Sequence, residues 1–116
     1  MKIQNVLGLI FLVLPGLAGA VGAIAVDNQQ GDGSPGYGIV TGKGSQREAE
    51  GAAMAECRRK GNERCRIAVW FNGCGAYASS SRTYGVGWGR TVEIASANAM
   101  EKCDQRSCKV HVAGCD

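Results

Sequence analysis

An internal repeat constrains this chain more than any other feature. Residues 45–57 and 91–103 match at a constant offset, so that Ala49, Ala53, Met54 and Cys57 correspond to Ala95, Ala99, Met100 and Cys103. The flanks correspond as well: 22–25 with 75–78, 37–39 with 84–86, and 65–69 with 108–112. Two copies are too few for an extended solenoid. The sequence therefore predicts a closed, pseudo-symmetric pair of units.

Each copy has the same order of local patterns. Two short apolar segments with glycine-rich sequence between or after them predict a hairpin of two strands. A helix follows, and then a strand of branched and aromatic residues at 66–71 in the first copy and at 109–113 in the second. The order strand, strand, helix, strand occurs twice. We therefore expect an α+β fold of two ββαβ repeats, with an antiparallel-rich sheet and both helices on one face.

The helix starts differ between the copies. The Ser45 hydroxyl can accept from the Glu48 amide while Glu48 reaches back to the Ser45 amide, which is the capping-box pattern. In the second copy Thr91 is the cap, but Ile94 replaces the acid, so this start should be less strongly fixed. Small residues recur every four positions along each helix, which lets it lie close to a sheet.

All six cysteines lie beyond residue 20, and an even number in an exported chain is typical of a disulfide framework. Zinc favours closely spaced cysteine pairs with histidines. The chain has no such pair, and its only histidine is His111, so we expect neither a metal nor another cofactor. The cysteines are Cys57, Cys65, Cys74, Cys103, Cys108 and Cys115.

The repeat narrows the fifteen possible pairings of six cysteines. In each copy one cysteine ends the helix and another opens the following strand, which favours Cys57 with Cys65 and Cys103 with Cys108. Cys74 then pairs with Cys115. We expect this third bond to tie the two halves of the molecule together.

The first twenty residues have the pattern of a cleaved signal peptide: a positive start, an apolar run at 6–14, and Ala18 and Ala20 before the cleavage point. A membrane anchor is the alternative, but the run is shorter than the roughly 20 residues that a spanning helix needs. We expect residues 1–20 to be removed, leaving no membrane anchor and a periplasmic or secreted protein. Residues 21–116 then form a single domain, with repeats at about 22–74 and 75–116.

Several segments together resemble a known family. They are Gly-Ala-Ile-Ala-Val at 22–26, Tyr-Gly ahead of the first helix, Ala-Ala-Met-x-x-Cys at 52–57, and Cys-Arg-Ile-Ala-Val-Trp-Phe at 65–71. The chain resembles the bacterial secreted domain-of-unknown-function family 4189 over nearly all of residues 22–115. The family supplies no catalytic residues to carry over. The resemblance allows an immunity role, because some exported proteins of this type are partners of secreted antibacterial toxins.

No catalytic set stands out. His111 corresponds to Ala68 in the other copy, which favours a strand residue over a catalytic base. The helix carboxylates are explained by solvated faces and caps. Without Lys2 the chain has 12 basic and 10 acidic residues, so there is no electrostatic case for a nucleic-acid partner. We therefore expect no enzymatic activity.

The candidate binding residues lie in or next to the glycine-rich segment 83–90. Tyr84 and Trp88 beside Arg82 and Arg90 have the composition of binding hot spots. The alternative, which β-propensity favours, is a strand whose aromatic residues pack in the core.

These observations favour an exported, non-enzymatic protein-binding domain. In its specific form the hypothesis is a periplasmic immunity protein that neutralises an antibacterial toxin from a secretion system, so the expected partner is a toxin or an envelope protein. The alternatives are a cell-envelope hydrolase, a carbohydrate-binding accessory domain, or a secreted effector.

Overall fold

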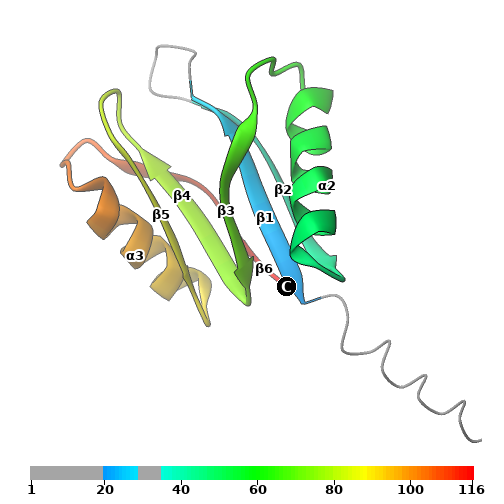
Figure 1. Cartoon of the computed structure of the whole chain (residues 1–116). Coiled ribbons are helices and arrows are strands. Elements are labelled where there is room, and N and C mark those ends of the chain that lie inside the picture. Colours follow the sequence, from blue (N-terminus) through cyan, green and yellow to red (C-terminus); the bar gives the residue numbers. More distant parts are fainter. Residues whose placement is uncertain (1–19, 29–34) are drawn as a thin grey trace, which may run out of the picture.

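The computed structural model describes residues 20–28 and 35–116 (Figure 1). The expected signal peptide, apart from its last residue, lies outside this part of the chain. Neither of the described helices has the length and apolar character needed to span a membrane.

The order of elements confirms the predicted ββαβ repeat. The first unit consists of β1 (Val21–Asp27), β2 (Gly36–Lys43), α2 (Gln46–Arg59) and β3 (Arg66–Asn72). The second consists of β4 (Cys74–Ser79), β5 (Tyr84–Gly89), α3 (Val92–Cys103) and β6 (Lys109–Cys115). All strand pairs are antiparallel. The fold is therefore α+β, as the sequence predicts.

The strands form two sheets rather than the single sheet that we expected. The first sheet has the order β2-β1-β3 and the second β5-β4-β6. The small residues of β1 pack against α2, those of β4 pack against α3, and a third cluster of larger side chains joins the two sheets. Figure 1 shows the two helices on opposite outer sides with the strands between them. The helices thus cover two faces, not one.

The central strands explain this arrangement. Along β1, Ala23 and Ala25 belong to the cluster beneath α2, whereas Ile24 and Val26 belong to the cluster between the sheets. Successive side chains of a strand point to opposite faces, so β1 needs an apolar layer on both sides. One sheet with both helices on the same face would leave Ile24 and Val26 in water.

Each helix rests almost directly on strand backbone. A Cβ at Gly38 would lie 2.4 Å from the Cys57 amide nitrogen, and one at the equivalent Gly85 would lie 2.3 Å from the Ala99 carbonyl oxygen. The alanine and cysteine stripes of the two helices are buried at these contacts. The predicted close packing of helix on sheet is confirmed.

Both predicted N-caps are present, with one change. The amides of Glu48 and Ile94 donate to the hydroxyls of Ser45 and Thr91, each at 3.1 Å. The Glu48 carboxylate does not reach the Ser45 amide as expected; it accepts from the Gly44 amide, one residue earlier, at 3.1 Å. The Glu48 carboxylate therefore still accepts a hydrogen bond from a backbone amide ahead of α2. Ile94, the equivalent residue of α3, has no carboxylate that could do the same.

Phe71 fills the space between the sheets at one end. A Cβ at Gly22 would come within 2.5 Å of its ring, and one at Gly75, the equivalent glycine of the second unit, within 2.2 Å. Phe71 itself corresponds to Gly114 in the repeat. One large side chain therefore packs against glycines of both units.

The three disulfides are Cys57–Cys65, Cys103–Cys108 and Cys74–Cys115, the pairs that the repeat favours. Such a framework is typical of oxidising compartments outside the cytoplasm. The last bond does not tie the halves together, because Cys74 and Cys115 are paired residues of neighbouring strands in the second sheet. The equivalent pair in the first sheet is Val21 and Asn72.

The two units are joined instead at Gly73, the single residue between β3 and β4, which has a φ of 87°. Asp116 adds contacts to the same turn: its amide donates to the Gly73 carbonyl at 2.8 Å, and its carboxylate accepts from the amides of Gly73 and Gly42 at 3.2 and 2.9 Å. The last residue thus bonds to the first unit.

Candidate binding groove

A groove of about 490 Å³ lies between the two sheets at one side of the molecule. It is lined by residues 68–72 of β3 and by Val86 and Trp88 of β5. Both strands are edges of their sheets. The groove is therefore bounded by two open strand edges and has a largely apolar lining.

The strand β5 presents two contrasting faces. Gly85, Gly87 and Gly89 lie under α3, where an added Cβ would meet helix atoms. Tyr84, Val86 and Trp88 alternate with them and occupy the other face. Tyr84 and Trp88 are 54% and 53% exposed, so the favoured expectation that these aromatic residues pack in the core is wrong. Because β5 is the edge strand of its sheet, β4 flanks them on one side only.

The exposed Tyr84 ring packs against a buried aromatic ring. It stacks on the buried ring of Tyr77 with 6.0 Å between the centroids. Burial raises the pKa of the Tyr77 hydroxyl, and the opposing hydrogen bond comes from the Asn28 amide at 3.4 Å. One end of the exposed aromatic row is therefore anchored in the core.

A second, smaller hollow of about 200 Å³ lies on the helix side of Trp88. It is lined by Val86, Gly87, Trp88, Asn98, Glu101 and Lys102. The Lys102 ammonium lies 5.4 Å from the centre of the Trp88 ring, a cation–π distance. The Asn98 side-chain amide donates to the Trp88 carbonyl at 3.0 Å. Trp88 thus stands between two hollows.

The backbone of β5 follows the same alternation. The Ser80 amide donates to the Thr83 carbonyl, so these residues form a hydrogen-bonded pair at the start of the β4–β5 ladder. In an antiparallel ladder such pairs alternate with non-hydrogen-bonded ones. The register then places Tyr84, Val86 and Trp88 in non-hydrogen-bonded pairs with β4. Their N–H and C=O groups point to the open edge, where the Trp88 carbonyl already accepts from the Asn98 side chain.

Residues 21–115 match the family described as "Domain of unknown function (DUF4189)". The chain belongs to the DUF4189 family. No curated protein and no solved structure matches it. The family assignment confirms the resemblance and brings no functional residues with it, so the site of this DUF4189 domain is defined by its geometry.

Two of the four sequence-predicted binding residues lie in β5 and the other two flank it, so they do not form one cluster. Arg82 is in the turn before the strand, where its amide donates to the Ser80 hydroxyl at 3.1 Å. Arg90 follows the strand at its other end. Tyr84 and Trp88 lie between them on the exposed face. The DUF4189 domain therefore carries a row of residues rather than a compact pocket.

Sequence reasoning missed the residues that complete the row. Sequence reasoning did not identify Val86 or the β3 side of the groove, which includes the 41% exposed Trp70. It also did not identify Asn98 and Lys102. The alternation of glycine with larger residues from 84 to 89 is the signal that could have identified Val86. Contacts from α3 to Trp88 have no signal in the sequence pattern, because they depend on how α3 packs against β5.

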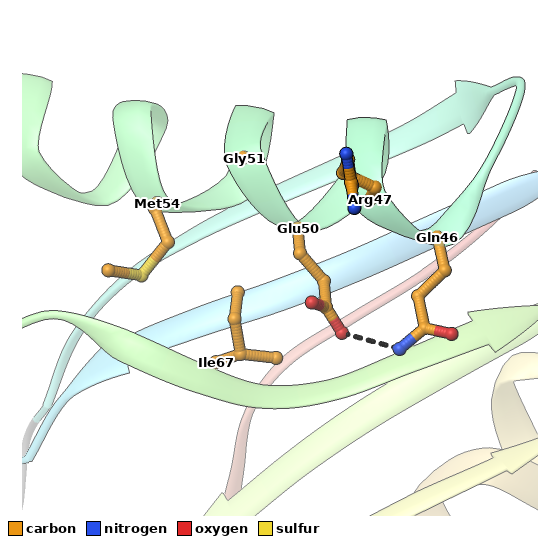
Figure 2. A pocket seen from close by; sticks show the side chains of 6 residues that line it. All are labelled: Gln46, Arg47, Glu50, Gly51, Met54 and Ile67. Atoms are coloured by element: carbon orange, nitrogen blue, oxygen red, sulfur yellow. Dashed lines mark hydrogen bonds between the residues drawn. The ribbon is translucent and has the colours of Figure 1, made fainter.

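A third hollow, of about 500 Å³, lies between α2 and β3 (Figure 2). Met54 points from the helix toward Ile67 on the strand, and Glu50 is held by the Gln46 side-chain amide at 2.9 Å. Glu50 is the only carboxylate lining it. The hollow thus combines an apolar floor with one hydrogen-bonded acid, and it does not present the pair of carboxylates that glycoside hydrolysis usually employs.

His111 occupies a strand bulge. The β4–β6 register skips it, just as the β1–β3 register skips the equivalent Ala68. Its Nε2 lies 3.3 Å from the Ser79 carbonyl oxygen.

Across residues 20–28 and 35–116 of the DUF4189 domain, no three His, Cys, Asp or Glu side chains gather closely enough to hold a metal ion.

Proposed function

We propose that this chain is an exported, non-enzymatic protein-binding domain that pairs an extended segment of its partner with the open edge of β5. The observation that carries the proposal is the coincidence of two properties in the same three residues. Tyr84, Val86 and Trp88 direct backbone hydrogen-bonding groups outward and also present exposed or half-buried side chains. Strand addition uses both, main-chain bonds for affinity and alternate side chains for specificity.

The two hollows beside Trp88 support this mode of binding. An added strand points its side chains alternately to opposite faces. One set would enter the apolar groove beside β3, and the other would enter the smaller hollow beside α3. Both sets of side chains therefore have a cavity available.

The composition of the edge also supports it. Natural proteins usually guard an exposed edge with charged residues, proline or a bulge. The strand Tyr84–Gly89 contains no charged residue and no proline, and its pairing with β4 has no register shift. In addition, the disulfide-bonded sheet holds the edge in place before binding, which reduces the entropy lost on association.

In its specific form, the proposal makes the chain an immunity protein whose partner is a toxin delivered by a neighbouring bacterium. The edge of β5 suits this role because pairing with a strand of the toxin can block the toxin without a catalytic reaction. The first experiment is capture of partners by residues 21–116 from periplasmic extract and from cells that express toxin genes encoded nearby. Growth rescue by co-expression then tests neutralisation.

The structural part of the proposal is tested on any captured partner by Val86→Pro. Proline removes the outward N–H without removing a bond to β4. The affinity should fall by about tenfold or more, which corresponds to about 1.4 kcal/mol. Ile39→Pro, at the equivalent position of β2, is the matched control and should bind normally. Equal binding by both variants, with unprotected amides at Tyr84, Val86 and Trp88 in hydrogen exchange, would rule out strand addition.

A carbohydrate-binding domain is the second candidate. It is favoured by the exposed Trp88 ring, which has Asn98, Glu101 and Lys102 beside it as polar groups. Peptidoglycan fragments that bind the wild type, but not Trp88→Ala, would support it. Release of soluble fragments during the same incubation would indicate a hydrolase instead.

A further inference from the structure

The charge around the groove is uneven. From residue 64 to residue 92 the chain contains four arginines and no acidic residue. This stretch includes both edge strands that bound the groove, together with β4 between them. The small net charge of the whole chain conceals this local excess.

The basic residues lie toward both ends of β5. Arg82 precedes Tyr84 in the chain. Arg66 lies near this end as well, because it pairs with Val26, which belongs to the same cluster between the sheets as Tyr77, the residue on which Tyr84 stacks. At the other end, Arg90 follows the strand and Lys102 lies over Trp88. Both ends of the edge therefore carry basic residues.

Acidic groups do not balance these charges at the groove. Among the residues that line the two hollows beside Trp88, Glu101 is the only acid. The larger hollow, the groove between β3 and β5, is apolar at Val69, Phe71 and Val86. The surface thus combines an apolar centre with a basic rim.

We propose that the segment added to β5 is an acidic, extended polypeptide whose central apolar side chains are flanked at both ends by Asp or Glu. This inference rests on the proposed strand addition and specifies the chemistry of the partner. The apolar side chains enter the groove between β3 and β5, and the carboxylates meet Arg66 and Arg82 at one end and Arg90 and Lys102 at the other. Such complementarity mainly sets specificity and the rate of encounter.

Three synthetic peptides test the inference with the disulfide-bonded domain 21–116. The first has a central run of Val flanked at both ends by Glu, and the other two replace every Glu by Gln or by Lys. Calorimetry should show the Glu peptide binding at least about tenfold more tightly than the Gln peptide, a difference of about 1.4 kcal/mol. The Lys peptide should bind most weakly, and the advantage of Glu should shrink at high salt.

Single substitutions test which arginines contact the carboxylates of the peptide. Arg66→Gln, Arg82→Gln and Arg90→Gln should each weaken binding of the Glu peptide and leave the Gln peptide unchanged. Arg47→Gln and Arg58→Gln, on α2, are matched controls that remove the same charge elsewhere and should have no effect. Equal affinity of the Glu and Gln peptides, with Tyr84, Val86 and Trp88 amides protected in both complexes, would overturn the acidic partner and leave strand addition intact. Protection of these amides by none of the peptides would overturn both proposals.

Discussion

The ring of Phe71 lies so close to Gly75 that a single added carbon would come within 2.2 Å of it. Gly75→Ala should therefore force Phe71 or β4 to shift and should lower the free energy of unfolding by about 1–3 kcal/mol, as overpacking usually does. Urea unfolding of residues 21–116 measures the change. Pairing Gly75→Ala with Phe71→Leu should recover part of the loss.

A glycine without such a neighbour gives the control. Gly51 lies on α2, and a Cβ there would meet nothing within 4 Å. Gly51→Ala should raise stability by up to about 1 kcal/mol through helix propensity alone. A similar loss in Gly51→Ala and Gly75→Ala would show that the Phe71 contact is not the cause.

The Cys74–Cys115 bond should contribute more stability than the bond at the end of α3. It spans a sequence separation of 41 residues, whereas Cys103–Cys108 spans 5. The loop-entropy relation gives about 4 kcal/mol for the first and about 2 kcal/mol for the second. Replacing Cys74 and Cys115 with the Val and Asn of the equivalent pair should lower the urea midpoint more than replacing Cys103 and Cys108 with serine. Equal losses would contradict the entropic account.

The helix caps provide a test of the difference between the copies. Ser45→Ala and Thr91→Ala each remove a hydroxyl acceptor and should cost about 1 kcal/mol. Glu48→Gln should cost less, because an amide oxygen can still accept from Gly44. Thermal unfolding monitored by circular dichroism gives the ranking. A neutral Ser45→Ala variant would show that the first cap does not contribute.

Stability should fall at alkaline pH because of Tyr77. Burial raises the pKa of its hydroxyl above the unfolded value of about 10. The contribution of the neutral phenol is complete below that value and is lost as the pH rises through the folded pKa. Tyr77→Phe should flatten the decline in unfolding free energy above pH 10. An unchanged slope in Tyr77→Phe would assign the decline to other groups.

The elements of this fold were predictable because their signals are local and occur twice. Ser45 and Thr91 mark the helix starts, and the small residues from Ala49 to Cys57 mark the face that packs on a sheet. Matching positions in the two copies also narrowed the cysteine pairing. Each of these inferences needs only a short stretch of chain or the comparison of one copy with the other.

The way the two units meet was not predictable in the same way. Apolar residues on both faces of β1 and β4 indicate burial on both sides, but they do not distinguish a helix from a second sheet as the covering layer. The position of Cys74, one residue beyond the β3–β4 turn, decides whether its bond lies within a unit or between units. The environment of Trp88 depends on Asn98 and Lys102 of α3, which reach it only after the chain has folded.

Residues from three separate parts of the chain lie together at the Gly73 turn. Val21 pairs with Asn72 just before it, and the Asp116 amide donates to the Gly73 carbonyl; Figure 1 shows the C-terminus beside the start of β1. The protein is therefore suited to circular permutation. A short linker from residue 116 to residue 21, with the chain opened at Gly73, would reverse the order of the two units while keeping every strand pair, every disulfide and the edge of β5 in place.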